Sequence, residues 1–241
     1  MKDVWQEVWK NGELEWKKED IISSKTLERL SSIIKNYFKL NSLRGLDTAE
    51  LGAGVGLASY FFANQGANVS LIDNSTNAKN LAKRWWGQEE HNYILADLFK
   101  YNKKKFDVVV SFGLCEHFIQ EQRTQVLKKH ISLLEDKGIA IISVPYKFGI
   151  FYQLSKAVAK LLRKWNFGVE VPFSRAEFED FAKNNNLKYQ IRVEGFHSSA
   201  YDFLIRKPLK LVGIRVNRKF ENTSSIFDNW FGSGIIAIFY K

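Results

Sequence analysis

The segment Leu46–Ala58, LDTAELGAGVGLA, decides the fold class of this 241-residue chain. An apolar run ending in Glu50 passes into three alternate glycines, Gly52, Gly54 and Gly56, and then into a helical pattern. Glycine allows sharp turns and leaves room for a ligand close to the backbone, where a Cβ would collide. The order strand, glycine loop, helix is typical of a nucleotide site, although a tight strand-to-helix turn without a ligand has the same residues.

The surrounding sequence alternates between apolar strands and amphipathic helices. We predict strands at 46–51, 68–72, 92–95, 106–112 and 138–144, and helices at about 55–65, 76–86 and 119–134. An earlier helix follows Ser23 or Ser24 and runs to about Phe38. This alternation predicts βαβ units, right-handed crossovers and an α/β, doubly wound, mostly parallel sheet.

The alternation breaks after the fifth predicted strand. Residues 148–165 carry a basic amphipathic helix pattern, which we interpret as an insertion. Ser174 and Glu177 have the spacing of a capping box for a helix to about Lys183. Strands at 187–196 and 234–240 complete the predicted sheet, and we expect the basic stretch between them to be irregular.

Composition excludes several classes of protein. With 45% hydrophobic residues and 26% charged residues, the chain is neither disordered nor fibrous. Its single cysteine excludes an internal disulfide and a cysteine-built zinc site. No apolar run approaches the ~18 residues that span a bilayer, and the charged first residues do not resemble a secretion signal, so we expect a cytoplasmic protein.

The net charge of +10 is concentrated in the last third of the chain. Residues 147–241 hold 16 Lys and Arg against 8 Asp and Glu. Such a surplus attracts anions, whether a phosphorylated substrate, nucleic acid or an acidic membrane, and it also serves solubility alone. The net charge therefore does not identify the binding partner.

Two further carboxylates stand where predicted strands end. Asp73, followed by Asn74 in VSLIDNS, is placed to accept hydrogen bonds from both hydroxyls of a ribose. Asp97, followed by Leu98 in YILADLF, is placed to accept from the amine of a base. Each aspartate alone is also common in a turn or at a helix start. Together with Glu50 they mark the ends of three consecutive strands, which favours a nucleoside site.

These motifs resemble those of class I S-adenosylmethionine-dependent methyltransferases. ELGAGVG is similar to the family's acidic-x-Gly-x-Gly-x-Gly loop, Asp73 to its ribose carboxylate, and Asp97 with Leu98 to its adenine contact. FDVVVSFGLCEHF resembles the segment that lines the methionine part of the donor. The resemblance implies S-adenosylmethionine as cofactor and a seven-stranded, Rossmann-like sheet whose last strand is antiparallel.

The resemblance also implies a set of donor contacts. Glu50 can favour the cationic end of the donor, and loop N–H groups can meet its carboxylate. The aromatic face of Phe112 can stabilise the sulfonium, although a buried core ring is the more usual role for such a residue. The implied cofactor-binding residues are Glu50, Gly52, Ala53, Gly54, Gly56, Asp73, Asn74, Asp97, Leu98 and Phe112.

We expect one methyltransferase domain over residues 1–241, because no repeat and no flexible linker divides the chain. Its parts are an N-terminal helical cap (1–44), a donor-binding core (45–145), a region with lid and substrate insertions (146–233) and the last strand (234–241). The oligomeric state stays open.

His117 is the candidate catalytic residue. An oxygen or nitrogen acceptor must often lose a proton, and this histidine follows the fourth strand, where a base would be useful. Packing or a contact with the cofactor would explain a histidine at this position equally well. Related quinone-type O-methyltransferases hold a metal with Glu-x-x-Glu-His, but Gly113 replaces the first Glu here, so we expect no metal. Cys115 has no adjacent proline, so a buried thiol is favoured over a nucleophile.

The leading function hypothesis is methyl transfer to oxygen or nitrogen of a small acceptor, with anionic and lipid-like molecules among the candidates. The alternatives are methylation of RNA and, in another class, a nicotinamide-dependent oxidoreductase or a non-catalytic nucleotide-binding module. The regions expected to select the acceptor are the N-terminal helix, 148–172 and 197–233. Their aromatic and His residues are Trp5, Trp9, Trp16, Tyr146, Phe151, Trp165, Phe173, His197, Tyr201 and Trp230.

The helix at 151–165 has two possible uses. It could lie on an anionic membrane, with its apolar side down and its lysines spread outward. We favour a lid that buries this apolar side on its own domain.

Overall fold

The computed structural model describes residues 2–10, 17–89, 91–214, 216 and 225–241. Seven strands form one sheet in the order β3-β2-β1-β4-β5-β7-β6. Their bounds are β1 Asp47–Leu51, β2 Asn68–Asp73, β3 Asn92–Leu95, β4 Phe106–Phe112, β5 Leu134–Pro145, β6 Lys188–Glu194 and β7 Gly234–Tyr240. Strands β1 to β5 pair in parallel, whereas β7 is antiparallel to both β5 and β6. The predicted fold class is confirmed.

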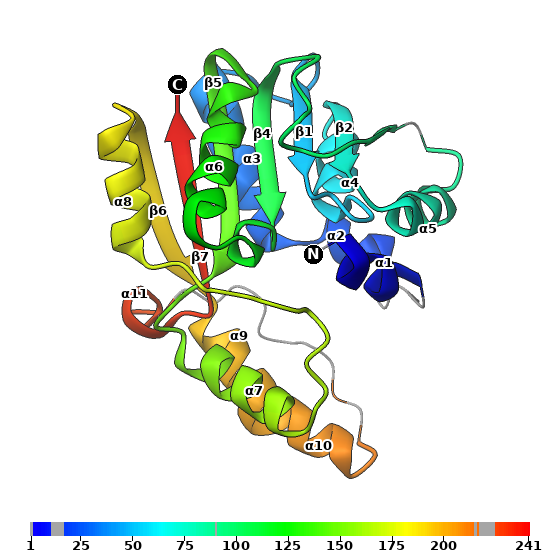
Figure 1. Cartoon of the computed structure of the whole chain (residues 1–241), viewed down its shortest axis with the longest axis vertical. Helices are drawn as coiled ribbons and strands as arrows, with labels where there is room; N and C mark the ends of the chain where they lie inside the picture. The colour runs from blue at the N-terminus through cyan, green and yellow to red at the C-terminus, as the bar shows by residue number, and fades with distance from the viewer. Residues whose placement is uncertain (1, 11–16, 90, 215, 217–224) are drawn as a thin grey trace.

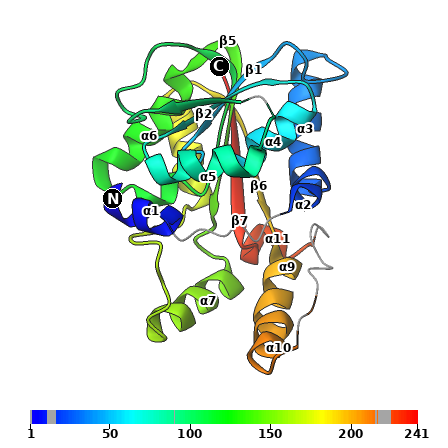
Figure 2. The ribbon, with the colours of Figure 1, turned by 90° about the vertical axis from the view of Figure 1, so that its right-hand side faces the viewer.

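Helices cover both faces of the sheet (Figures 1 and 2). The helices α3 (Lys25–Phe38), α4 (Leu57–Asn64) and α5 (Thr76–Trp86) share one hydrophobic cluster with Val108 and Ile236. The helices α6 (Gln120–Ser132) and α8 (Arg175–Asn184) share the other with Val109 and Phe239. Because the central strands are buried on both sides, they appear in the sequence as continuous apolar runs.

Two predicted helix starts have the expected caps. Ser24 precedes α3, and its side chain accepts a hydrogen bond from the Leu27 N–H. Ser174 precedes α8 and forms a capping box with Glu177, whose carboxylate accepts from the Ser174 N–H at 2.8 Å. Each cap satisfies backbone donors that the first helical turn leaves open.

The expectation of an irregular segment before the last strand is wrong for the described residues 196–214 and 225–231, whereas residues 215 and 217–224 of that segment lie outside the described residues. The structure has α9 (Phe196–Tyr201), a π-helical turn at Asp202–Arg206, α10 (Lys207–Leu211) and α11 (Asp228–Phe231). The sequence did not predict this helical run because it contains Pro208 and many basic residues. Pro208 lies just after the π-helical turn and inside this run, where a proline normally removes a backbone hydrogen bond.

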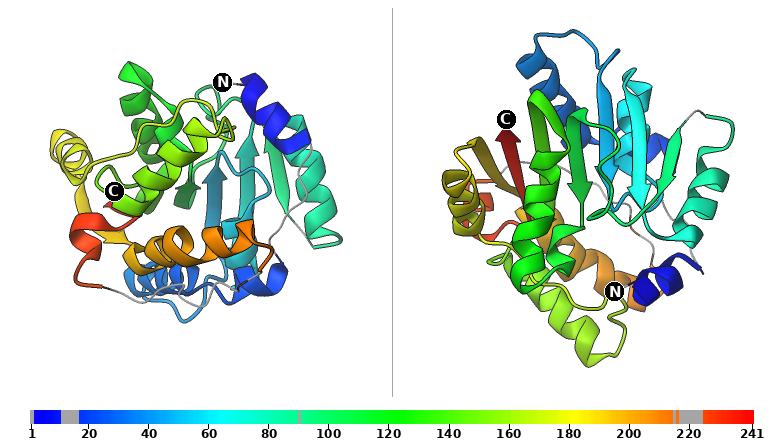
Figure 3. Two further views of the ribbon diagram at one scale, coloured as in Figure 1. Left: turned by 90° about the horizontal axis from the view of Figure 1, so that it is seen from below. Right: turned by 45° about the horizontal axis from the view of Figure 1, so that its top comes forward.

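The carboxyl ends of the parallel strands point toward the remaining helices (Figure 1). The helices α1 (Lys2–Lys10) and α2 (Lys18–Ile22) lie at this edge, and α7 (Ile150–Leu161) extends below it together with α9 and α10. Figure 3 shows the same helices from below. We call residues 147–171 and 196–214 the lower lobe. Among the described residues, no helix has the length and apolarity required to span a membrane.

Candidate functional site

A cavity of about 1510 Å³ opens at the carboxyl edge of the sheet. Its wall combines loops that follow β1, β2, β3 and β4 with parts of α1, α3 and α9. The predicted site residues in this wall are Glu50, Gly52, Ala53, Asp73, Asn74, Asp97, Leu98, Phe112 and His117. The structure therefore gathers in one cavity residues that the chain spreads over 68 positions.

Gly54 and Gly56 shape the glycine loop without lining the cavity. Both have positive φ angles, 54° and 77°, which residues with a Cβ rarely adopt. Gly56 is also the N-cap of α4. A Cβ at Gly54 would lie 2.5 Å from the ring of Trp9, which packs on the loop from α1. Glycine is thus required at Gly54 both by the turn and by this close approach.

The Asp73 carboxylate joins the end of β2 to the glycine loop. Its Oδ2 accepts from the Gly54 N–H and its Oδ1 from the Ser75 N–H, both at 2.8 Å. Burial raises the pKa of Asp73, and these backbone donors oppose that rise. Each carboxylate oxygen has a further lone pair, so the group can still accept from ribose hydroxyls in the cavity.

Glu50 has a structural partner within the protein. Its Oε2 accepts from the N–H and the hydroxyl of Ser59, at 2.8 and 2.7 Å, and thereby holds the first turn of α4. Burial raises the pKa of Glu50 to about 7. A cation beside this carboxyl would favour its ionised form.

Asp97 lies in an exposed turn after β3. Its Oδ1 accepts from the Phe99 N–H at 3.0 Å. This is the turn role that the sequence offered as the alternative to a base contact. The same residue and Leu98 line the cavity. The turn therefore presents Asp97 at the edge where the resemblance implies the adenine contact.

His117 closes the short 3₁₀ turn Cys115–His117 after β4. Its Nδ1 lies 2.8 Å from the Val169 carbonyl oxygen, which can only accept, so Nδ1 carries the proton. Burial lowers the pKa of the imidazole and favours its neutral form. Nε2 is then left with a lone pair. The Trp5 ring packs against the imidazole in an edge arrangement, with centroids 4.8 Å apart.

The known proteins to which the chain is similar in sequence and in fold are methyltransferases. A family model described as a methyltransferase domain matches residues 49–142, from the glycine loop to β5. The chain is 27% identical over 172 residues to a ubiquinone biosynthesis O-methyltransferase of Rickettsia bellii, covering 67% of this chain and 68% of that protein. It is 25% identical over 190 residues to the enzyme of the same name from Actinobacillus pleuropneumoniae, covering 73% and 80%.

The chain is similar to S-adenosylmethionine-dependent methyltransferases. Its fold is similar to that of the plantazolicin methyltransferase BpumL in complex with SAH, with a TM-score of 0.65, 17% identity and coverage of 100% and 95%. It is also similar to magnesium protoporphyrin IX methyltransferase from Synechocystis PCC 6803, with a TM-score of 0.60, 17% identity and coverage of 99% and 94%. The methyltransferase match and these neighbours favour S-adenosylmethionine over a nicotinamide as the cofactor.

The site includes α1, which precedes the one N-terminal helix whose bounds the sequence predicted. Gln6 on α1 accepts from the Ser75 hydroxyl at 3.1 Å, and its carbonyl oxygen accepts from the Asn77 side chain at 2.9 Å. These bonds dock α1 on the start of α5, beside Asp73. The four-residue spacing of Trp5 and Trp9 was the available signal, because it places both rings on one helical face.

The aromatic residues expected near the acceptor separate into two groups. Trp5, Trp9 and Tyr201 line the cavity, as predicted. Phe173 instead stacks on Phe178 in the core, at 4.7 Å between centroids. The cavity wall does not include Tyr146, Phe151, Trp165, His197 or Trp230, and Trp16 lies outside the described residues.

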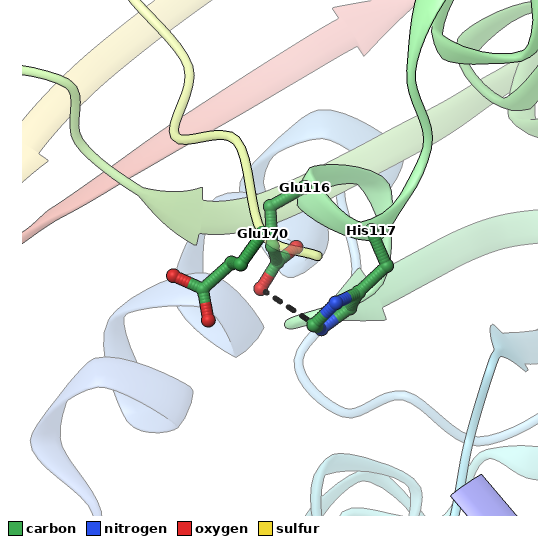
Figure 4. A group of neighbouring side chains, drawn as sticks. All are labelled: Glu116, His117 and Glu170. Carbon is green, nitrogen blue, oxygen red and sulfur yellow. Dashed lines mark ion pairs between the residues drawn. The ribbon is translucent and has the colours of Figure 1, made fainter. Parts of the chain in front are cut away.

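Glu116, His117 and Glu170 form a buried cluster beside the cavity (Figure 4). One ligand atom of each lies within 4.8 Å of the others, so the group could hold a metal ion. Glu170 reaches it from the loop after α7, which no sequence spacing indicated. Burial raises the pKa of Glu116 to about 8, with a contribution from the Glu170 charge, and burial raises that of Glu170 to about 7.

A lysine already lies on this cluster. The Lys156 ammonium is 3.3 Å from Glu170 Oε1 and donates to the Glu170 carbonyl oxygen at 2.7 Å. Within the part of the chain that the structure describes, Glu116 Oε2 has no hydrogen-bond partner. A protonated Glu116 beside the Lys156–Glu170 ion pair leaves the cluster without excess charge.

Proposed function

We propose that this methyltransferase methylates a hydroxyl oxygen on a small aromatic acceptor, with His117 as general base. The observation that carries the proposal is the fixed tautomer of His117: Nδ1 is committed to Val169, and Nε2 keeps its lone pair. A neutral imidazole can remove a proton from the acceptor at the moment of methyl transfer. A base at this position is useful only if the acceptor, like a hydroxyl, must lose a proton.

The surroundings of His117 favour a flat, apolar acceptor. The Trp5 ring stands edge-on to the imidazole, and Phe112 and Phe118 line the same cavity. Aromatic rings pack well against such edges and faces. The curated relatives, which are named ubiquinone biosynthesis O-methyltransferases, support an oxygen acceptor on a ring.

In this proposal the protein mainly orients the reactants. The sulfonium of bound S-adenosylmethionine supplies a reactive methyl group. The oxygen attacks the methyl carbon as the bond to sulfur breaks, and its proton passes to His117 Nε2. Alignment of oxygen, methyl and sulfur supplies most of the acceleration. Asp73 and Asp97 hold the nucleoside, and α1 closes the cavity over it.

The proposal includes no metal. The Lys156 ammonium supplies the positive charge beside Glu170, and protonation of Glu116 removes the repulsion between the carboxyl groups. The acceptor oxygen therefore meets a base rather than a bound cation.

The test is a methyl-transfer assay with S-adenosylmethionine labelled in the methyl group. The acceptor panel contains dihydroxybenzenes with and without an alkyl side chain, the corresponding anilines, and bulk RNA. We expect label on the phenolic oxygen, lost in His117→Ala. Transfer to the anilines or to RNA in preference to every phenol would overturn the proposal, and the RNA result would support the alternative suggested by the basic last third.

A further inference from the structure

Helix α7 exposes its apolar stripe. Ile150, Leu154, Val158 and Leu161 are 45%, 44%, 45% and 83% exposed. Their spacing of four, four and three residues places them on one face of the helix. A helix of a soluble protein normally turns such a face toward the core. The favoured interpretation from the sequence, a lid that buries this face on its own domain, is therefore wrong.

The inward side of α7 carries a buried lysine. Lys156 is the one buried residue of the helix and pairs with Glu170. Its ammonium lies 5.0 Å from the centre of the Trp165 ring. Burying an ammonium is costly unless it is paired, so this arrangement fixes which face of α7 points outward. The exposed stripe is thus a consequence of specific contacts.

A second helical segment in the lower lobe repeats this exposure. Leu204 and Ile205 in the π-helical turn are 59% and 45% exposed, and Val212 and Ile214 after α10 are 71% and 52% exposed. The Phe151 ring of α7 packs near that of Phe203, at 6.0 Å, so the two segments are joined. Both extend below the sheet, beyond the carboxyl ends of its parallel strands (Figures 1 and 2).

Basic residues surround these apolar side chains. The lower lobe, residues 147–171 and 196–214, contains eight Lys and Arg against two Asp and Glu. Both acids have partners, since Glu170 pairs with Lys156 and Asp202 with Arg206. The exposed cations near the helix ends are Lys160, Arg163, Lys164, Lys207 and Lys210.

We propose that the lower lobe is a docking surface for an anionic lipid bilayer. The exposed stripe of α7 and the apolar residues around α10 enter the interfacial layer, and the surrounding cations bind lipid phosphates. An apolar face bordered by Lys and Arg is the pattern that interfacial helices use, and a bilayer accepts it without a complementary shape. The positive charge favours acidic headgroups over neutral ones.

Docking in this way has a consequence for the active site. Ser198, Ser199 and Tyr201 of α9 belong to both the lower lobe and the cavity wall. The cavity would then lie close to the bilayer surface, where an acceptor with an apolar chain resides. The docking itself does not depend on which acceptor is methylated.

The test is co-sedimentation of the full chain with vesicles of phosphatidylcholine alone or with a third of the lipid replaced by phosphatidylglycerol. We expect at least about tenfold tighter binding to the acidic vesicles, weakened by added salt. The double variant Val158→Glu/Leu161→Glu removes the apolar contact, and Arg163→Glu/Lys164→Glu removes the charge. Ile22→Glu, at a 49% exposed site on α2, and Lys103→Glu, at an exposed loop site, are the matched controls.

Both lobe variants are expected to lose binding to acidic vesicles by about tenfold or more, and both controls to bind as the wild type does. Unchanged binding of S-adenosylhomocysteine shows that each variant is folded. Equal binding of the wild type to both vesicle types, or wild-type binding by the lobe variants, would overturn the proposal. A wild type that is dimeric and binds neither vesicle type would also overturn the proposal if Val158→Glu/Leu161→Glu made it monomeric. The stripe would then join two copies of the chain.

Discussion

The His117 imidazole donates from Nδ1 to the Val169 carbonyl oxygen, 2.8 Å away and 52 residues later in the chain. Val169 lies in the loop that joins α7 to the core, next to Glu170. One hydrogen bond therefore connects the candidate base with the lower lobe and sets the tautomer of the base. The orientation of His117 depends on a segment outside the region matched by the family model.

Replacing His117 by alanine tests the proposed base. We expect turnover to fall by about 10²- to 10⁴-fold, because proton removal loses its acceptor. The affinity for S-adenosylhomocysteine, measured by calorimetry, should change little. His197→Gln, at an exposed site on α9, is the control. In the wild type the rate should rise with pH through the pKa of His117, which burial places below its usual value of about 6.5. Normal turnover of His117→Ala would restrict His117 to packing.

Asp73→Ala tests the donor site. The substitution removes a carboxylate that can bind the ribose and that accepts from the Gly54 N–H. Charge-assisted hydrogen bonds of this kind contribute about 1.5–3 kcal/mol, so the dissociation constant for S-adenosylhomocysteine should rise at least about tenfold. Asp136→Ala removes a carboxylate whose side chain is 97% exposed and serves as the control. Equal affinities of Asp73→Ala and the wild type would contradict the assignment of Asp73.

Trp9→Ala tests whether α1 belongs to the donor site. The Trp9 ring packs against Gly54 and lines the cavity, so its loss should loosen the glycine loop and expose the donor to water. We expect weaker binding of S-adenosylhomocysteine by about 1 kcal/mol or more, from the loss of a large apolar contact. Trp230→Ala, at a 61% exposed site on α11, should bind normally. If the two variants bind equally well, α1 plays no part in retaining the donor.

A chelator tests the absence of a metal. With Lys156 as the cation beside Glu170, EDTA should leave the initial rate of methyl transfer unchanged, and calorimetric titration with Mn²⁺ should show no stoichiometric binding. The opposite outcome has a clear signature: loss of activity in EDTA, recovery with Mg²⁺, and stoichiometric Mn²⁺ binding that Glu170→Gln abolishes. That result would make Glu116, His117 and Glu170 a metal site.

The raised pKa of Glu116 predicts how stability depends on pH. A carboxyl that ionises near pH 8 when folded, against 4.5 as its ordinary value, holds its proton more tightly in the folded state. The free energy of unfolding should therefore fall as the pH rises from about 4.5 to about 8. Glu116→Gln should lose less stability between pH 5 and pH 8 than the wild type, by about 1 kcal/mol or more, in urea denaturation. The same slope in both proteins would contradict a protonated Glu116. Glu121→Gln, at an exposed site on α6, is the control.

The sheet could be predicted from the sequence because its signals are local. Each strand from β1 to β5 is a short apolar run followed by a turn and a helix pattern, and the Ser24 and Ser174 caps are readable from a few residues. The gathering of Glu50, Asp73 and Asp97 at one edge follows from parallel strands, whose carboxyl ends meet there. This part of the site needs no knowledge of distant contacts.

The features that the sequence did not reveal depend on distant contacts. Glu170 reaches Glu116 only because the segment after α7 returns to the β4 turn, where the Val171 N–H donates to the Glu116 carbonyl oxygen at 2.7 Å. The Lys156–Glu170 pair sets which face of α7 points outward, and Glu170 lies outside the helix. The amphipathic pattern of the helix alone favoured burial of its apolar face. The helical run at 196–211 was missed because Pro208 normally interrupts a helix.

The most direct test of the account is a crystal structure of the protein with S-adenosylhomocysteine. We expect the ribose hydroxyls at Asp73, the adenine beside Asp97 and Leu98, and the sulfur directed toward the part of the cavity lined by His117 and Trp5. A ligand bound elsewhere, or one at this edge with its sulfur directed away from His117, would contradict the account.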